Sequence, residues 1–270
     1  MITKWKSLAT RRSFFVRPCY PQLFEKIFGQ ITEYQNYPHE EGICGVIQTG
    51  CPGIGMSFSL TYYLWALAQR KQTVYFESQM LKCGWLFSLD GTVLEFKFKH
   101  MPLKLVTNPK LVYLFDASEI TIGGPTREIA GYTILATSPK KDHYSDFRKT
   151  VQENRLYMPI WAEDEIAKYA ADTIADAAIR RTVISCYLRF GGVARYVFGS
   201  QKGYARRLEG EIKNANLDLI KRSLTGYALE DMSHWIMHYD VDDSFESISM
   251  KFASKYVEDA VYGNVVQYQR

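Results

Sequence analysis

The segment Gly50-Cys51-Pro52-Gly53-Ile54-Gly55-Met56-Ser57 lies between two stretches with different hydrophobic patterns. Before it, residues 43–49 form an apolar run of strand length. After it, residues 57–70 follow a helical pattern that is rich in apolar side chains. Glycines at such a junction allow backbone N–H groups to curl around an anion, and the start of the helix adds positive potential. The sequence therefore predicts a strand–turn–helix unit that can hold phosphate groups.

The spacing of these residues fits the P-loop pattern Gly-x-x-x-x-Gly-Lys-Ser/Thr at every fixed position except one. Met56 stands where the pattern has lysine, which supplies a positive charge to the terminal phosphates. Since a charge-assisted hydrogen bond contributes about 1.5–3 kcal/mol, we expect weakened binding of ATP or GTP and impaired or lost hydrolysis. The predicted nucleotide-binding segment runs from Gly50 to Phe58. A glycine-rich turn without a ligand is the alternative.

An apolar run that ends in a carboxylate supplies the second part of the prediction. Residues 111–115 indicate a buried strand and lead directly into Asp116. In P-loop proteins a carboxylate at this point helps to hold Mg²⁺, together with the hydroxyl that ends the loop. We therefore predict that Asp116 and Ser57 bind magnesium and that Asp116 takes part in catalysis. Glu119 is a candidate for orienting the attacking water, although a solvated loop carboxylate is the more common role of such a residue.

Two further candidate sites follow a strand and a glycine pair. Thr137 and Ser138 end the strand predicted for residues 132–136, where a hydroxyl could contact the γ-phosphate or the attacking water. The same two residues could equally close an ordinary turn. Gly191-Gly192 precedes Arg195, which could bring a catalytic cation to the phosphates. The alternative there is a glycine that ends a helix, next to a surface arginine.

Composition and charge limit the class of protein. The chain has 270 residues, of which 47% are hydrophobic and 14% aromatic, so we expect a folded chain rather than a disordered one. No apolar run reaches about 18 residues, so a membrane partner is not expected, and no cleavable signal is visible. The five scattered cysteines predict reduced thiols in an intracellular compartment. The 33 basic and 29 acidic residues give a net charge of +4, which permits a nucleic-acid partner without requiring one.

The cysteines and histidines give no metal-binding pattern. The five cysteines share no Cys-x-x-Cys spacing, so neither a zinc site nor a disulfide framework is indicated. His234 and His238 are four residues apart, as on one face of a helix, but Trp235 stands where zinc hydrolases have glutamate. We expect this pair to pack on the core.

The order of the apolar segments predicts an α/β fold. We expect a P-loop NTPase-like, mainly parallel central sheet flanked by helices and followed by a helical C-terminal subdomain. The predicted division is a basic and aromatic lead-in at residues 1–42, an α/β core at residues 43–162 and the helical part at residues 163–270. Helices are expected at residues 20–28, 163–188, 205–219 and 245–261, and a hairpin with an Asp90-Gly91 turn at residues 86–98.

Several of these segments together resemble the nucleotide-binding region shared by Crinkler-type effector proteins and retrotransposon hot spot proteins. The matching stretches are Phe15-Val16-Arg17 with Tyr20, residues 50–57, residues 111–116, Ala136-Thr137-Ser138-Pro139 with Tyr144 and Phe147-Arg148, Met158-Pro159 with Trp161, and residues 190–196. The resemblance implies a P-loop NTPase domain that uses Mg²⁺ with ATP or GTP. It also implies a role in the nucleus, which is the host nucleus for a secreted effector.

Two departures from the pattern of these families bear on activity. Met56 replaces the usual lysine, so the Walker A motif is degenerate, and Ala194 stands where Gly-Gly-x-Pro-Arg has proline, while Arg195 is retained. No Crinkler header is recognisable at the N-terminus, and no nuclease constellation of carboxylates and lysine follows residue 203. We interpret the chain as the NTPase unit alone.

These observations leave two functional interpretations open. The first is a nucleotide-binding, P-loop NTPase-like domain with weakened or lost hydrolysis, in which Arg195 could act on a neighbouring copy in a homo-oligomer. The alternative is a non-catalytic module that binds nucleic acid or a nuclear protein. Arg206-Arg207 and Lys221-Arg222 could then follow a phosphate backbone, with Tyr204 and Phe147 stacking on bases, although charged surfaces usually have no such role.

Overall fold

The computed structural model describes residues 14–37, 44–117, 125, 129–139, 145–152, 154–199, 201–225 and 233–268. Its strands are β1 (Gly45–Thr49), β2 (Thr73–Ser78), β3 (Cys83–Phe87), β4 (Val93–Lys97), β5 (Leu111–Ala117), β6 (Tyr132–Thr137), β7 (Arg155–Tyr157), β8 (Met237–Val241) and β9 (Ile248–Phe252). Its helices are α2 (Cys19–Asn36), α3 (Met56–Gln69), α4 (Leu103–Val106), α5 (Ser145–Thr150), α6 (Glu163–Thr173), α7 (Ala177–Phe190), α8 (Ala194–Phe198), α9 (Gln201–Lys213), α10 (Leu217–Leu224) and α11 (Lys255–Tyr268).

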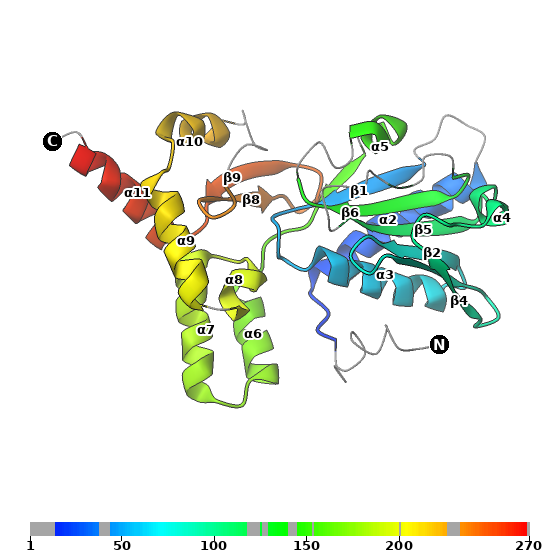
Figure 1. The fold of residues 1–270 in the computed structure, drawn as a ribbon, viewed down its shortest axis with the longest axis horizontal. Helices are drawn as coiled ribbons and strands as arrows, with labels where there is room; N and C mark the ends of the chain where they lie inside the picture. The colour runs from blue at the N-terminus through cyan, green and yellow to red at the C-terminus, as the bar shows by residue number, and fades with distance from the viewer. Residues whose placement is uncertain are drawn as a thin grey trace.

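The described strands β1 to β7 form one sheet in the order β4-β3-β2-β5-β6-β1-β7 (Figure 1). Neighbours among β2, β5, β6, β1 and β7 are parallel, and the predicted hairpin adds β3 and β4 as antiparallel neighbours at one edge. Because parallel strands end at the same edge of a sheet, the carboxyl ends of β1, β5 and β6 lie side by side. The predicted α/β fold class, a mainly parallel central sheet flanked by helices, is confirmed.

Helices cover both faces of this sheet. Helices α2 and α3 pack on one face, where Leu60 and Ile134 belong to the larger apolar core. On the other face, Leu105 of α4 and Phe147 of α5 pack against side chains of the strands. Strands β5 and β6 are therefore buried along their whole length, which explains their continuous apolar sequences.

The elements from α6 to α11 lie together beside one end of the sheet (Figure 1, left). Helix α7 is central to this group because it packs against α6, α8 and α11. Strand β8 connects the group to the sheet, since the backbone N–H of Tyr239 points at the Cys51 thiol, 3.4 Å away. No helix of the described part of the chain has both the length and the apolar character of a membrane span.

The C-terminal part is mainly helical, as expected, but the helix predicted at residues 245–261 and the helical face predicted for His234 and His238 are wrong between Met237 and Phe252. There β8 and β9 form an antiparallel pair, and the last helix begins only at Lys255. His238 therefore lies on a buried strand and not on a helix face, with Nε2 3.1 Å from the carbonyl oxygen of His234. Burial lowers the pKa of His238 to about 3, so the ring is neutral and forms part of the core.

Capping side chains divide two of the predicted helices. The helix expected at residues 163–188 is α6 and α7, because the Asp176 carboxylate accepts hydrogen bonds from the N–H groups of Ala178 and Ile179. The helix expected at residues 205–219 is α9 and α10, and the Asn216 side chain accepts from the N–H of Leu219. Such caps satisfy N–H groups that a helix start leaves without partners.

Candidate phosphate-binding site

The predicted phosphate loop lies at the junction between β1 and α3, as the sequence indicates. Gly53 has φ of 94° and Gly55 has φ of 109°, which is a left-handed conformation that other residues rarely adopt. A Cβ on Gly53 would lie 2.7 Å from the Cβ of Arg195, and one on Gly55 would lie 2.7 Å from the Tyr20 hydroxyl. Glycine is therefore required at both positions for two reasons: the backbone has a positive φ, and a side chain would collide with a neighbouring residue.

Three carbonyl groups of the loop are held from outside it. The Gly53 oxygen accepts from the N–H of Arg195 at 3.1 Å, the Ile54 oxygen from Trp161 Nε1 at 2.8 Å and the Gly55 oxygen from the Tyr20 hydroxyl at 3.0 Å. In a planar trans peptide, the following N–H points away from the carbonyl. The N–H groups of residues 54–56 therefore point away from these partners. Among the residues that the structure describes, the N–H groups of residues 54–57 have no protein acceptor.

A buried arginine, Arg17, stabilises the loop through contacts with the segments that pack against it. Arg17 is fully buried and forms a two-point ion pair with Glu165, with Nε–Oε1 and Nη2–Oε2 distances of 3.1 and 3.0 Å. Its guanidinium group also donates to the carbonyls of Pro159 and Ile160, each at 3.0 Å, and lies 4.8 Å from the centre of the Trp161 ring. One Arg17 nitrogen is 3.4 Å from the Ile54 oxygen. We call Arg17, Glu165 and Trp161 the loop brace.

The two predicted magnesium ligands lie in contact. The Ser57 hydroxyl donates to Asp116 Oδ1 at 2.9 Å, and Ser78 of the neighbouring strand donates to Oδ2 at 3.4 Å. Burial raises the pKa of Asp116, and the hydrogen bonds from Ser57 and Ser78 oppose this effect. No group of three or more His, Cys, Asp or Glu side chains in the described ranges could hold a metal ion. A hydroxyl and one carboxylate nevertheless fit Mg²⁺, which takes few protein ligands when it binds phosphates.

Two buried hydroxyls lie at the same carboxyl edge. Thr137, predicted from the sequence, ends β6, and Thr49 ends β1 beside it, since the preceding residues Ala136 and Gln48 pair in register. Both hydroxyl oxygens are buried, and neither has a hydrogen-bond partner among the residues that the structure describes. Such a group costs free energy unless something binds it. Thr49 was not predicted, because a threonine inside an apolar strand gives no signal of its own.

The remaining predicted site residues differ in their exposure and in their distance from the loop. Arg195 is exposed on α8, and its side chain lies over Gly53, so the structure brings this arginine to the loop. Ser138 follows the end of β6. Met56 is half-buried and packs against the apolar core. Glu119 lies outside the described residues.

The loop brace shows what sequence reasoning missed. The sequence indicates Arg17, Tyr20 and Trp161 only through the family resemblance, without a role, and it gives no signal for Glu165. A single arginine inside the apolar run Phe14-Phe15-Val16-Arg17 was the available signal, since an arginine in such a run needs a partner when it is buried.

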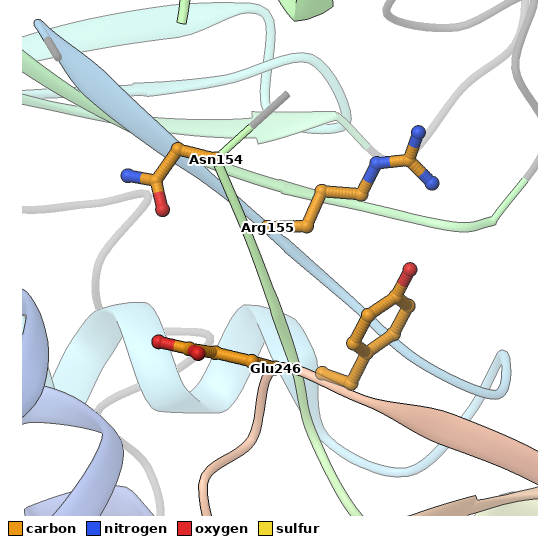
Figure 2. Close-up of a pocket in the computed structure, with 4 residues that line it drawn as sticks. Asn154, Arg155 and Glu246 are labelled. Atoms are coloured by element: carbon orange, nitrogen blue, oxygen red, sulfur yellow. The ribbon is translucent and has the colours of Figure 1, made fainter. Parts of the chain in front are cut away.

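A hollow of about 430 Å³ lies at β7, the edge strand of the sheet. It is lined by Asn154, Arg155, Tyr157 and Glu246. Figure 2 shows Asn154 and Glu246 pointing to one side of the strand and Arg155 to the other. Arg155 pairs with Ile47 in the middle of β1 and Tyr157 pairs with Thr49 at its carboxyl end, so the hollow follows the outer side of β7 along most of that strand. We assign it no part in the phosphate site.

Comparison with known proteins gives one sequence likeness and several structural ones. No protein-family model matches this chain. Crinkler effector proteins 15 and 16 of Phytophthora infestans are each 30% identical to it over 157 residues, or 56% of this chain. The match covers 24% of each of them, so the chain spans about a quarter of the length of these curated relatives.

The solved structures with a similar arrangement are distant in sequence. The ORC2 protein of Aeropyrum pernix, solved as ADPNP–ADP complexes, has a TM-score of 0.42 and 12% identity, with 96% of this chain and 95% of that one covered. Cdc6p of Pyrobaculum aerophilum has a TM-score of 0.39 and 10% identity, with 96% and 97% covered. A katanin structure concerned with self-assembly has a TM-score of 0.40 and 12% identity, with 89% and 80% covered.

Proposed function

We propose that this chain binds the polyphosphate of a nucleoside triphosphate, with Mg²⁺, at residues 50–57, and that it hydrolyses the nucleotide very slowly or not at all. The observation that carries the proposal is the set of N–H groups at residues 54–57, which have no acceptor among the described residues. Three loop carbonyls are held on the opposite side. A cluster of such amides at a helix start is an anion-binding arrangement.

The residues around the loop have distinct proposed roles. Bound Mg²⁺ would neutralise charge on the β- and γ-phosphates, and Ser57 and Asp116 would hold it. The Thr137 and Thr49 hydroxyls would donate to polar groups that the bound nucleotide brings to the carboxyl edge. Arg195 would supply a cation from the exposed side of the loop. Met56 supplies neither a charge nor a donor, which is why we propose weak binding and little turnover.

An equilibrium titration tests this function directly. ATP and GTP should bind the wild-type chain weakly, and Mg²⁺ should tighten binding because Asp116 and Ser57 are already in contact. Hydrolysis, followed as phosphate release, should stay close to the rate without protein. Absence of nucleotide affinity with and without Mg²⁺ would contradict the proposal, and fast turnover would contradict the role given to Met56.

The substitution Asp116→Asn is expected to raise the stability of the chain and to abolish the effect of Mg²⁺ on nucleotide binding. Burial raises the pKa of Asp116, which means that the ionised carboxylate destabilises the folded chain. Stability is therefore lost as the pH rises from the pKa of the unfolded chain, about 3.9, through the higher pKa of the folded chain. The neutral amide removes that cost, and the melting temperature at pH 7 should rise by about 2–4 °C for each kcal/mol regained. The same change removes a metal ligand.

Two measurements check this expectation in the same preparation. Thermal unfolding at pH 7 should show the higher melting temperature, and the difference from wild type should shrink toward pH 4. Nucleotide titration should show that Mg²⁺ no longer tightens binding. A variant that melts lower than wild type and keeps its magnesium dependence would show that Asp116 serves the fold and not the metal.

We further propose that the chain is the nucleotide-binding unit of a Crinkler-type protein. The 30% identity over 157 residues supports this, and the likeness to retrotransposon hot spot proteins rests on the motifs alone. The same proposal has three further parts. They are a nuclear site of action, assembly of copies through Arg195, and a division of the chain into residues 1–42, 43–162 and 163–270. Imaging of the fluorescently tagged full-length gene product in host cells tests the nuclear location, and exclusion from the nucleus would refute it.

A further inference from the structure

Two phenylalanine rings lie exposed beside the phosphate loop. Phe14 and Phe58 are 40% and 45% exposed, yet their rings stack on each other with centroids 6.1 Å apart and planes 28° apart. Tyr20 supports these rings from the core: it is 1% exposed, and its ring centroid lies 6.4 Å from that of Phe14. We call these three residues the aromatic shelf. Large apolar rings left in water are unfavourable unless they serve a contact.

The aromatic shelf is continuous with the proposed phosphate site. Phe58 directly follows Ser57, whose hydroxyl binds Asp116. Tyr20 belongs to both features, because its ring lies beside Phe14 while its hydroxyl donates to the Gly55 carbonyl. A nucleotide held by its phosphates at residues 54–57 has its base one ribose away from them. The aromatic shelf therefore lies within the reach of a base.

We propose that the base of the bound nucleotide stacks on the aromatic shelf. This inference rests on the proposed function and adds to it a binding surface for the base, since the loop holds only the phosphates. The Phe14 and Phe58 rings already pack against each other, so the base would lie over their exposed surface and not between them. Stacking of a base on an aromatic side chain contributes about 1–3 kcal/mol.

The chemistry of the aromatic shelf also predicts its selectivity. Phe14 and Phe58 carry no polar side-chain atoms, and the hydroxyl hydrogen of Tyr20 is donated to Gly55. The aromatic shelf thus offers ring surface without a hydrogen-bond donor to read the edge of a base. ATP and GTP should bind with affinities within a few-fold of each other. Pyrimidine nucleotides should bind more weakly, because their single ring covers less of the surface.

Paired titrations with Mg-ATP and magnesium with inorganic tripolyphosphate test the proposal. Phe58→Ala should weaken ATP binding by about 5- to 150-fold, the range that 1–3 kcal/mol implies, and leave tripolyphosphate binding unchanged. Phe14→Ala should act in the same direction. Trp65→Ala is the matched control, because Trp65 is an exposed aromatic residue of the same helix, 58% exposed and two turns further on. It should leave both affinities unchanged.

Each other outcome decides the question. Unchanged ATP binding in Phe58→Ala overturns the proposal and assigns the shelf to a different occupant, such as a protein. Equal losses of ATP and tripolyphosphate binding overturn it too, because the ring would then act through the loop. A wild-type chain that binds neither ligand contradicts the proposed function instead. If Phe58→Ala does not fold, Phe58→Leu keeps an apolar side chain without the ring, and it should show the same selective loss of ATP binding.

Discussion

Replacing Met56 with lysine is expected to tighten the binding of Mg-ATP by about 10- to 150-fold. Met56 is the first residue of α3, and its own backbone N–H is one of the loop N–H groups that have no acceptor among the described residues. A lysine there adds a charge-assisted hydrogen bond to the phosphates, and such a bond is worth about 1.5–3 kcal/mol. Calorimetric titration of wild type and Met56→Lys with ATP at fixed Mg²⁺ measures the difference. Phosphate release should rise as well, since the lysine also stabilises charge during transfer.

A second substitution at the same position separates charge from packing. Met56 is half-buried against the apolar core, so any change there also alters packing. Met56→Leu keeps an apolar side chain of similar volume and adds no charge. It should bind ATP as the wild type does. If Met56→Lys and Met56→Leu have the same affinity, the missing cation is not what weakens this site.

The loop brace is expected to show the largest effect on stability. Arg17→Met removes the fully buried partner of an ion pair and leaves the Glu165 carboxylate, which is 12% exposed, without its cation. Loss of one partner of a buried pair costs about 3–5 kcal/mol of unfolding free energy. Denaturant unfolding measures this loss. Nucleotide affinity should fall as well, because the carbonyls of Pro159, Ile160 and Ile54 lose the hydrogen bonds that the Arg17 guanidinium donates to them.

Two companion variants make this result specific. The double variant Arg17→Met with Glu165→Leu removes both charges, so it should recover most of the stability, while the carbonyls stay without their donor. Lys168→Met breaks the exposed Lys168–Asp172 pair, in which both side chains are more than half exposed, and should cost about 1 kcal/mol or less. A cost for Arg17→Met no larger than that for Lys168→Met would show that the brace does not hold the loop.

The sequence predicts those parts of the site that depend on neighbouring residues. The loop at residues 50–57 and the burial of β5 and β6 each follow from a local pattern of glycines or apolar residues. The contact between Ser57 and Asp116 was also predictable, because the carboxyl ends of parallel strands share one edge. These features need no knowledge of which distant segments meet.

Features that depend on distant contacts could not be predicted in this way. Arg17 and Glu165 are 148 residues apart in the chain, and neither has a neighbour that signals the pairing. The sequence does not distinguish the β8–β9 pair from helix, because its strands are only five residues long and short apolar runs fit both periods. Strand β8 is determined by tertiary contacts, among them the buried thiol of Cys51 in the phosphate loop.

The most direct test of the central claim observes the loop amides themselves. Two-dimensional ¹⁵N–¹H spectra of the labelled chain, recorded as inorganic tripolyphosphate and Mg²⁺ are added, report on each N–H group. We expect the resonances of Ile54, Gly55, Met56 and Ser57 to shift together in a saturable manner, since these N–H groups have no acceptor among the described residues. Shifts confined to other parts of the chain, or none at all at millimolar ligand, would contradict a phosphate site in this loop.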